Sequence, residues 1–247
     1  MDRPSFKEFD QSFAQFAREQ GFRRTELTDL PTGALVAYVR DAEGAGVERS
    51  VYISAGIHGD EPAGPLALSE LMRKGSFSRN VNWTLLPLLN PDGWQTGTRE
   101  NAQGIDLNRD FFSFAASETQ AVAQWIPQRA PFDLYLSLHE DWESSGFYLY
   151  EINACAAASL SATILQAVAG IIPIEPQGIV DGHKLCAPGL ILHPPRPDEP
   201  DCWPEAIFHA DLYSLHSYTF ESPSSLPLAQ RIAAQVTAVK AAVQGFG

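Results

Sequence analysis

Apolar runs and helical stripes alternate along most of this chain. The first stripe consists of phenylalanines at the spacing of one helical face, which predicts a helix that docks on the core: Phe6, Phe9, Phe13 and Phe16. Short apolar runs predict strands at 35–40, 51–56, 83–89, 132–138, 147–150 and 215–220. Longer patterns predict helices at about 62–74, 119–128, 154–169 and 226–243. This alternation predicts one α/β domain over residues 1–247, with a twisted, largely parallel mixed sheet and helices on both faces.

The segments between these elements carry their own signals. A turn sequence at 43–46 predicts a hairpin between the strands 35–40 and 51–56. The sequence Asn90-Pro91-Asp92-Gly93 predicts a tight turn, and a long polar loop follows it to about Phe112. Loops of that length in compact domains are usually functional. Frequent prolines without periodicity predict a loop-rich insertion at about 171–210.

Charge and composition narrow the function classes. The 247 residues carry 17 basic and 30 acidic side chains, a net charge of −13, which argues against a general binder of nucleic acid or anionic membranes. We find no apolar signal core at the N-terminus and no window approaching the roughly 18 apolar residues of a membrane span. Cys155, Cys186 and Cys202 have no metal-ligand spacing, so we expect reduced thiols and a cytoplasmic protein.

Polar residues stand at the ends of three predicted strands. His58 follows the strand 51–56, His139 follows the strand 132–138, and Glu221 stands at the end of the strand 215–220. In open α/β sheets the ligand crevice lies beyond the carboxyl ends of the strands. Glu61 is three residues after His58 at a strand-to-helix corner, so His58, Glu61 and His139 would make three zinc ligands with an open position. The alternative for Glu61 is a glutamate in the first turn of a helix, stabilised by the positive end of the helix dipole. The alternative for His139 is a polar residue that merely ends a strand.

Two further features fit hydrolytic chemistry. A carboxylate at Glu221, beside the metal, would take a proton from water and pass it to a leaving group. Its alternative is a place near a helix N-cap, because serines follow it before a predicted helix. The polar loop carries Arg99, Asn108 and Arg109, and arginine binds carboxylates and stabilises oxyanions. The alternative for this loop is surface ion pairing with its own acidic residues.

Six sequence elements occur in a familiar order: His58-Gly59-Asp60-Glu61, Asn90-Pro91-Asp92-Gly93, Arg99, Asp106-Leu107-Asn108-Arg109, His139 and Phe220-Glu221. In this order the chain resembles the M14 zinc carboxypeptidase superfamily, and within it the short bacterial members that include murein-peptide amidases. The resemblance covers 51–223 and implies a zinc-carboxypeptidase-like fold with one zinc ion per chain.

The same resemblance implies a role for each matching residue. His58, Glu61 and His139 would bind the zinc ion, and Glu221 would be the general base and acid. Arg99 would act on the scissile carbonyl. Asn108 and Arg109 would hold the terminal carboxylate of the substrate. Asp106 would orient His58 from the side away from the metal.

The chain departs from the better-known carboxypeptidases at one point. They carry a mobile tyrosine roughly twenty residues before the catalytic glutamate, whereas the segment 197–203 has none, and Tyr213 and Tyr218 match no motif. The resemblance therefore does not predict the lid or the side-chain pocket. Of the remaining histidines, His183 is expected to be able to line the cleft.

The other side chains near the predicted site receive no ligand role. His193, His209 and His216 match no ligand spacing and are predicted to be structural or on the surface. Glu140 and Asp141, which follow His139, are not predicted to bind a second metal.

These observations favour a zinc-dependent metallopeptidase of the carboxypeptidase type. It would hydrolyse a C-terminal peptide or amide bond in a small peptide or amino-acid-derived substrate with a free carboxylate. An alternative is a zinc-dependent deacylase of N-acyl amino acids, resembling aspartoacylase and succinylglutamate desuccinylase. That branch tends to have Asn where this chain has Asp60, which favours the peptidase. A third possibility is a catalytically silent binding protein with the same fold.

Overall fold

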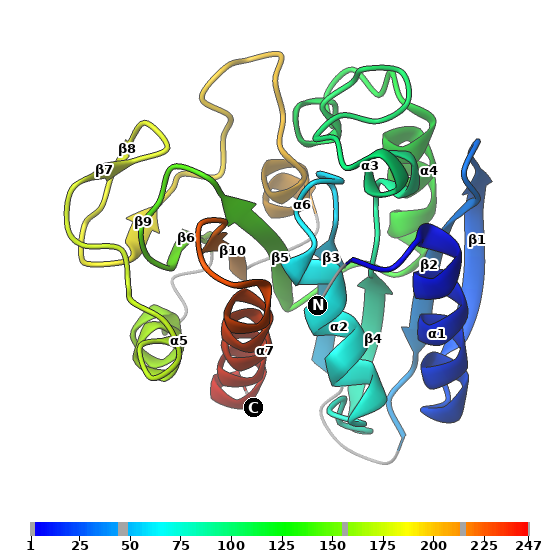
Figure 1. The fold of residues 1–247 in the computed structure, drawn as a ribbon, viewed down its shortest axis with the longest axis horizontal. Coiled ribbons are helices and arrows are strands. Elements are labelled where there is room, and N and C mark those ends of the chain that lie inside the picture. Colours follow the sequence, from blue (N-terminus) through cyan, green and yellow to red (C-terminus); the bar gives the residue numbers. More distant parts are fainter. Residues whose placement is uncertain (1–2, 44–48, 155–157, 213–215, 247) are drawn as a thin grey trace.

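One mixed sheet organises the chain (Figure 1). The computed structural model describes residues 3–43, 49–154, 158–212 and 216–246. The strands are β1 (Arg23–Asp29), β2 (Ala34–Arg40), β3 (Arg49–Ala55), β4 (Val81–Leu86), β5 (Leu134–Asp141), β6 (Tyr148–Asn153), β7 (Ile179–Val180), β8 (His183–Lys184), β9 (Leu190–Leu192) and β10 (His216–Pro223). Within the described residues, eight strands pair in the order β1-β2-β4-β3-β5-β10-β6-β9, and β7 pairs with β8 separately.

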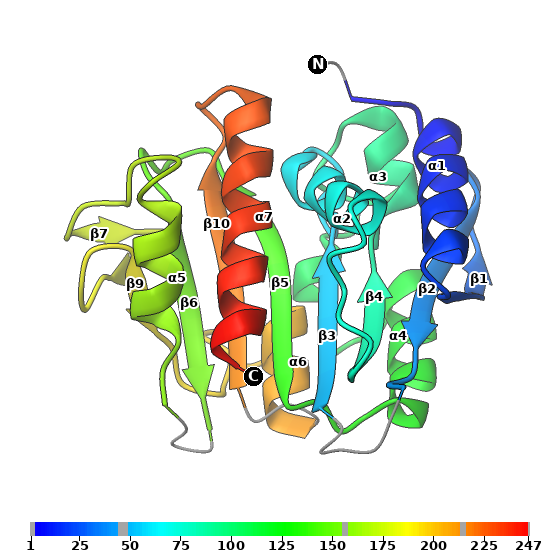
Figure 2. The same ribbon diagram turned by 90° about the horizontal axis from the view of Figure 1, so that it is seen from below.

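Helices cover both faces of this sheet. They are α1 (Phe6–Glu19), α2 (Ala63–Arg73), α3 (Pro91–Thr96), α4 (Ser117–Trp125), α5 (Ser161–Val168), α6 (Glu205–Leu212) and α7 (Leu228–Gly245), with short 3-10 helices η1 (Leu107–Arg109) and η2 (Ile126–Gln128). Figure 2 shows α1, α2, α5 and α7 on one face and α4 and α6 on the other. The single α/β domain with helices on both faces is thus confirmed.

The central strands are apolar along their whole length because both of their faces are covered. Strand β3 pairs in parallel with β4 and with β5, and β5 pairs in parallel with β10. Successive side chains of a strand point to opposite faces. Ile53 therefore packs in the core beneath α2 and α7, while Tyr52 packs in the core beneath α4 and α6. Because these neighbouring strands are parallel, the carboxyl ends of β3, β5 and β10 lie side by side at the same end of the sheet.

The predicted hairpin between 35–40 and 51–56 is wrong. Strand β2 pairs antiparallel with β1 and with β4, so that β4 lies between β2 and β3. The sequence pattern shows strands but not their partners, and β3 has both edges occupied by parallel neighbours. Strand β1 was missed because it is a polar, largely exposed edge strand without an apolar run. Most of the turn at 43–46 lies outside the described residues.

Other boundaries also differ from the sequence prediction. The segment after Asn90 forms the short helix α3 rather than a tight turn alone, because the Asn90 side chain accepts a hydrogen bond from the Gly93 amide and caps the helix. Strand β5 continues to Asp141 and β10 to Pro223, so His139 and Glu221 lie within strands. Helix α5 begins at 161 rather than 154. Helix α6, in the stretch predicted as loop, was not foreseen.

The structure bears on two expectations drawn from composition, the state of the cysteines and the lack of a membrane-spanning helix. Cys186 and Cys202 are free thiols, as predicted, and Cys155 lies outside the described residues. Among the helices that the structure describes, none combines the length and the apolar character that crossing a bilayer requires.

Candidate metal centre

The corner that carries His58 is built by glycines and by its contact with α3. Gly56, directly after β3, has φ +62°, a conformation that glycine adopts without the strain of a side chain. A Cβ on Gly59 would stand 1.9 Å from the Gly93 carbonyl carbon, so only glycine allows this close approach. The Gly56 carbonyl accepts a hydrogen bond of 2.9 Å from the Asn90 amide. The Asn90 segment therefore holds the His58 corner in place.

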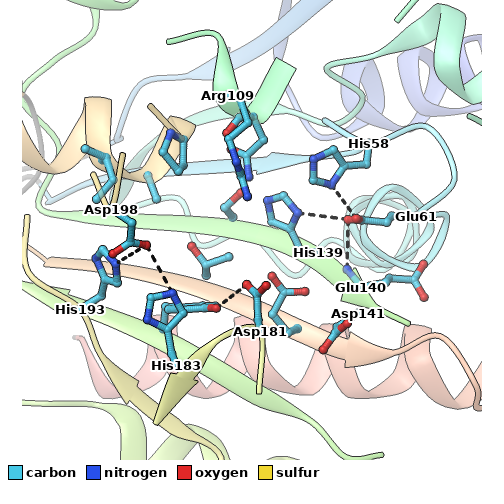
Figure 3. Close-up of a pocket in the computed structure, with 18 of the residues that line it drawn as sticks. His58, Glu61, Arg109, His139, Glu140, Asp141, Asp181, His183, His193 and Asp198 are labelled. Carbon is cyan, nitrogen blue, oxygen red and sulfur yellow. Dashed lines mark hydrogen bonds and ion pairs between the residues drawn. The ribbon is translucent and has the colours of Figure 1, made fainter. Parts of the chain in front are cut away.

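Three predicted ligands converge at the carboxyl edge of the sheet (Figure 3). Nδ1 of His58 lies 2.6 Å from Oε1 of Glu61, and Nδ1 of His139 lies 3.1 Å from Oε2 of the same carboxylate. One ligand atom from each of the three side chains falls within 4.8 Å of the other two, and all three side chains are buried. The structure thus brings together two imidazoles and a carboxylate as predicted.

Glu61 draws positive charge to His58, whereas burial lowers the pKa of His139. Burial alone would lower the pKa of His58, but the Glu61 charge and the Asp106 hydrogen bond raise it to about 9. Burial alone would raise the pKa of Glu61, but the charges of His58 and His139 hold it well below its usual range. A cluster that attracts protons in this way also attracts a divalent cation, whose binding displaces those protons.

Asp106 lies behind His58, on the side away from Glu61. Its Oδ1 is 3.3 Å from Nε2 of His58 and accepts the Asn108 backbone N–H at 2.9 Å. Metal-ligating histidines generally have such a carboxylate on their second ring nitrogen. The position of Asp106 matches the orienting role that the resemblance implies.

Arg99 lies between this carboxylate and the cluster. Its Nε and one terminal nitrogen are each 3.0 Å from Oδ2 of Asp106. The other terminal nitrogen is 3.8 Å from Oε1 of Glu61. The ion pair with Asp106, which the sequence left as an alternative, is thus formed. The same ion pair directs the Arg99 guanidinium toward Glu61.

Glu221 is positioned by the parallel pairing of β10 with β5. In this register Glu221 stands directly opposite His139. Burial, followed by the negative charges of Glu61 and Asp141, raises the pKa of Glu221 well above its usual range. A carboxylate in this environment accepts a proton readily, as a general base must.

Asn108 and Arg109 line the same cleft from η1, but they are not equally free. Oδ1 of Asn108 accepts the backbone N–H of Glu205 at 3.0 Å and so supports the first turn of α6. Arg109 is exposed, and one of its terminal nitrogens donates to the Asn108 carbonyl at 2.9 Å. Of the two side chains, the guanidinium of Arg109 is therefore the freer to bind a ligand in the cleft (Figure 3).

Most of these side chains line one cleft of about 830 Å³. The predicted site residues lining it are His58, Glu61, Arg99, Asn108, Arg109, His139 and Glu221. Its other wall includes residues that sequence reasoning had not assigned to the site: Trp142, Tyr148, Tyr150, Asp181, His193 and Asp198. His183 also lines the cleft, in agreement with the expectation for it.

The remaining candidates divide between core and cleft. His209 and His216 are buried in the core, which fits their predicted structural roles, and His193 lines the cleft, a position that its sequence spacing did not indicate. Tyr218 is a core residue whose hydroxyl accepts the Leu160 amide, and Tyr213 lies outside the described residues. Nothing in the local spacing of His193 marked it, because the segments that bring it to the cleft are irregular.

The donor set fits zinc. Two imidazole nitrogens and a carboxylate are ligands that zinc prefers, and three protein ligands are typical of its catalytic sites. The orienting carboxylate at Asp106 completes the arrangement. His58, Glu61 and His139 would hold the ion, with the cleft in front of them.

Comparisons with known proteins agree with this geometry. Residues 47–174, just over half of the chain, match the succinylglutamate desuccinylase/aspartoacylase catalytic domain. Murein peptide amidase A of Escherichia coli K12 is 40% identical over 81 residues, which cover 33% of each chain. Carboxypeptidase 2 of Trichophyton rubrum is 26% identical over 162 residues, 59% of this chain and 30% of that protein. The chain thus spans about a third of the length of each of these relatives.

Solved structures extend the likeness to nearly the whole chain. A candidate metallopeptidase of Shewanella amazonensis SB2B is 26% identical, with a TM-score of 0.85, over 97% of this chain and 92% of that one. Carboxypeptidase A of Helicoverpa armigera is 14% identical with a TM-score of 0.71, over 98% and 73% of the two chains, and shows the fold alone. The chain therefore belongs to the succinylglutamate desuccinylase/aspartoacylase family, within the M14 superfamily of zinc-carboxypeptidase-like folds.

Proposed function

We propose that this protein is a zinc-dependent metallopeptidase of the carboxypeptidase type. It hydrolyses a peptide or amide bond next to a free carboxylate in a small peptide or amino-acid-derived substrate. The observation that carries the proposal is the convergence of His58, Glu61 and His139 in a cleft that Glu221 and Arg109 also line. The local likeness to murein peptide amidase A supports it.

The residues divide the reaction among them. His58, Glu61 and His139 would hold a zinc ion, which would supply the Lewis acidity that polarises a carbonyl and makes water a stronger acid. Glu221 removes the proton of the attacking water and later delivers it to the leaving amine. Arg99, aimed by Asp106, stabilises the negative charge that develops on the carbonyl oxygen.

Substrate orientation is assigned to the loop that carries η1. Arg109 binds the terminal carboxylate, since its planar guanidinium donates two parallel hydrogen bonds to such a group. Asn108 stands beside it and supports the backbone at the start of α6. A cytoplasmic location stays a prediction from the sequence.

A deacylase of N-acyl amino acids is the second candidate, and the family match over residues 47–174 favours it. The same ligands and base would serve that reaction, which differs in the group on the acyl side. A substrate panel separates the two: free dipeptides, murein tripeptides and N-acyl amino acids. Turnover of the peptides supports the peptidase, whereas turnover of the N-acyl amino acids alone would replace it with the deacylase.

A silent binding protein remains the third reading of the sequence. It predicts that zinc-loaded protein turns over no member of this panel. Chelator treatment supplies the matching control, because activity that disappears with the metal and returns with added zinc belongs to the site rather than to a contaminant.

A further inference from the structure

The cleft wall formed by the segment after β6 carries a second set of metal-ligand side chains. His183 lies on β8, and His193 and Asp198 lie after β9 (Figure 3). Among the described residues, this trio and the His58 cluster are the two groups in which three potential ligand atoms lie within 4.8 Å of one another. The assigned reaction uses none of the three.

The distances within the trio are those of ligands around one ion. Oδ2 of Asp198 is 3.4 Å from Nε2 of His183 and 3.4 Å from Nε2 of His193. Direct charge-assisted hydrogen bonds are shorter, about 2.7–2.9 Å. Two ligand atoms that each lie about 2.0–2.1 Å from a tetrahedral zinc ion are separated by roughly 3.3–3.4 Å. The two printed spacings thus equal those of ligands around one tetrahedral ion, and the His183 and His193 ligand atoms lie within 4.8 Å of each other.

The tautomer of His193 strengthens this reading. Its Nδ1 lies 2.8 Å from the Pro194 carbonyl oxygen, which can only accept, so Nδ1 must carry the hydrogen. In the neutral ring Nε2 then holds a lone pair, and it faces the Asp198 carboxylate. Either a proton on Nε2 or a metal cation in its place can join these two atoms, and metal binding displaces such a proton. A backbone carbonyl on the far nitrogen is also the usual support of a metal-bound histidine.

The two imidazoles are held in place by an aromatic side chain of β6. The Tyr150 ring packs edge-on against His183, with centroids 5.5 Å apart, and against His193 at 6.1 Å. The Tyr150 hydroxyl donates to Asp181 at 2.6 Å, which fixes the ring. The site is thus built from several elements and does not depend on a single surface loop.

We propose that His183, His193 and Asp198 form a second divalent-cation site, of the class that binds zinc. Two imidazoles and one carboxylate are borderline ligands, and a three-residue set leaves a coordination position for water or for an anionic group in the cleft. The Asp198 side chain is 66% exposed, so this site binds more weakly and exchanges metal faster than the buried His58 cluster. The proposal does not depend on which reaction the first site performs.

Zinc stoichiometry tests the proposal directly. The purified full chain is stripped with a chelator and dialysed against buffered zinc, and the metal per chain is measured by mass spectrometry. We expect two equivalents in the wild type, one in His193→Ala and one in His139→Ala, because each variant loses a ligand of one site. Glu199→Gln, a neighbouring cleft carboxylate outside the trio, is the matched control and should keep two.

A second variant and a spectroscopic signature guard against misfolding. Asp198→Asn changes an exposed side chain without disturbing the core and should weaken the second equivalent by more than about tenfold. In the His139→Ala background, cobalt should give visible d–d absorption that Asp198→Asn removes. A wild type that binds one zinc ion overturns the proposal. Two ions retained in both His193→Ala and Asp198→Asn also overturn it, because the second ion then lies elsewhere.

Discussion

Glu221 stands directly opposite His139 in the parallel pairing of β10 with β5. Two strands far apart in the chain thus deliver a carboxylate and a predicted metal ligand to one edge of the sheet. The base and the ligand are separate groups, so their functions can be removed separately. The first prediction uses this separation.

Replacement of Glu221 by Gln should leave zinc bound and reduce kcat by about 10²–10⁴-fold, because it removes the base and none of the ligands. Turnover and zinc content are measured on the same sample. Glu143→Gln, which changes an exposed carboxylate on the same cleft, should keep wild-type turnover. Retained activity in the Glu221 variant would refute its role.

Replacement of Arg109 by Ala should raise KM about tenfold or more for substrates with a free carboxylate and change kcat much less. The physical reason is the loss of a charge-assisted pair that forms equally in the ground and transition states. Arg79→Ala, which removes an exposed guanidinium paired with Glu43, is the matched control. If amidated and free substrates lose equally, Arg109 does not anchor the carboxylate.

Replacement of Asp106 by Ala should lower zinc affinity by about 10–100-fold, because His58 loses the carboxylate that orients it. Competition with a chelating dye measures the affinity. Asp110→Ala is an instructive control, since Asp110 accepts from the Ala115 and Ala116 amides and supports the start of α4. That variant should lose stability and keep its zinc affinity. Equal affinity in wild type and Asp106→Ala would contradict the orienting role.

The buried Glu151 predicts an acid-dependent loss of stability. Burial would raise its pKa, but hydrogen bonds from His216, Ser159 and Ser161 outweigh burial and hold the pKa at about 2, below its ordinary value of 4.5. A lowered pKa contributes stability above about pH 4.5 that is lost as the pH falls toward 2. Urea unfolding should therefore show Glu151→Gln destabilised near neutral pH, with the difference shrinking toward pH 3. A difference that does not change with pH would contradict this assignment.

The candidate site could be named from the sequence to an unusual extent, because its residues sit at element boundaries that leave local signals. His58 and Glu61 stand at a strand-to-helix corner marked by glycine and proline, and their spacing alone lets them converge. His139 and Glu221 end apolar runs. The sequence pattern also gave the alternation of strands and helices, and with it the α/β class, since burial on both faces makes central strands continuously apolar.

Tertiary structure decided what depends on contacts between distant segments. Strand β4 lies between β2 and β3 because strand partners are chosen by the whole sheet, not by the nearest turn. The side-chain oxygen of Asn108 accepts a hydrogen bond from the backbone of Glu205 at the start of α6. No local sequence pattern revealed this contact. His193 faces the cleft only because the irregular segment after β6 folds across it. The sequence by itself therefore determined which polar residues stand near the carboxyl ends of the central strands. The folded chain determined which other side chains face them, because that proximity comes from long-range packing.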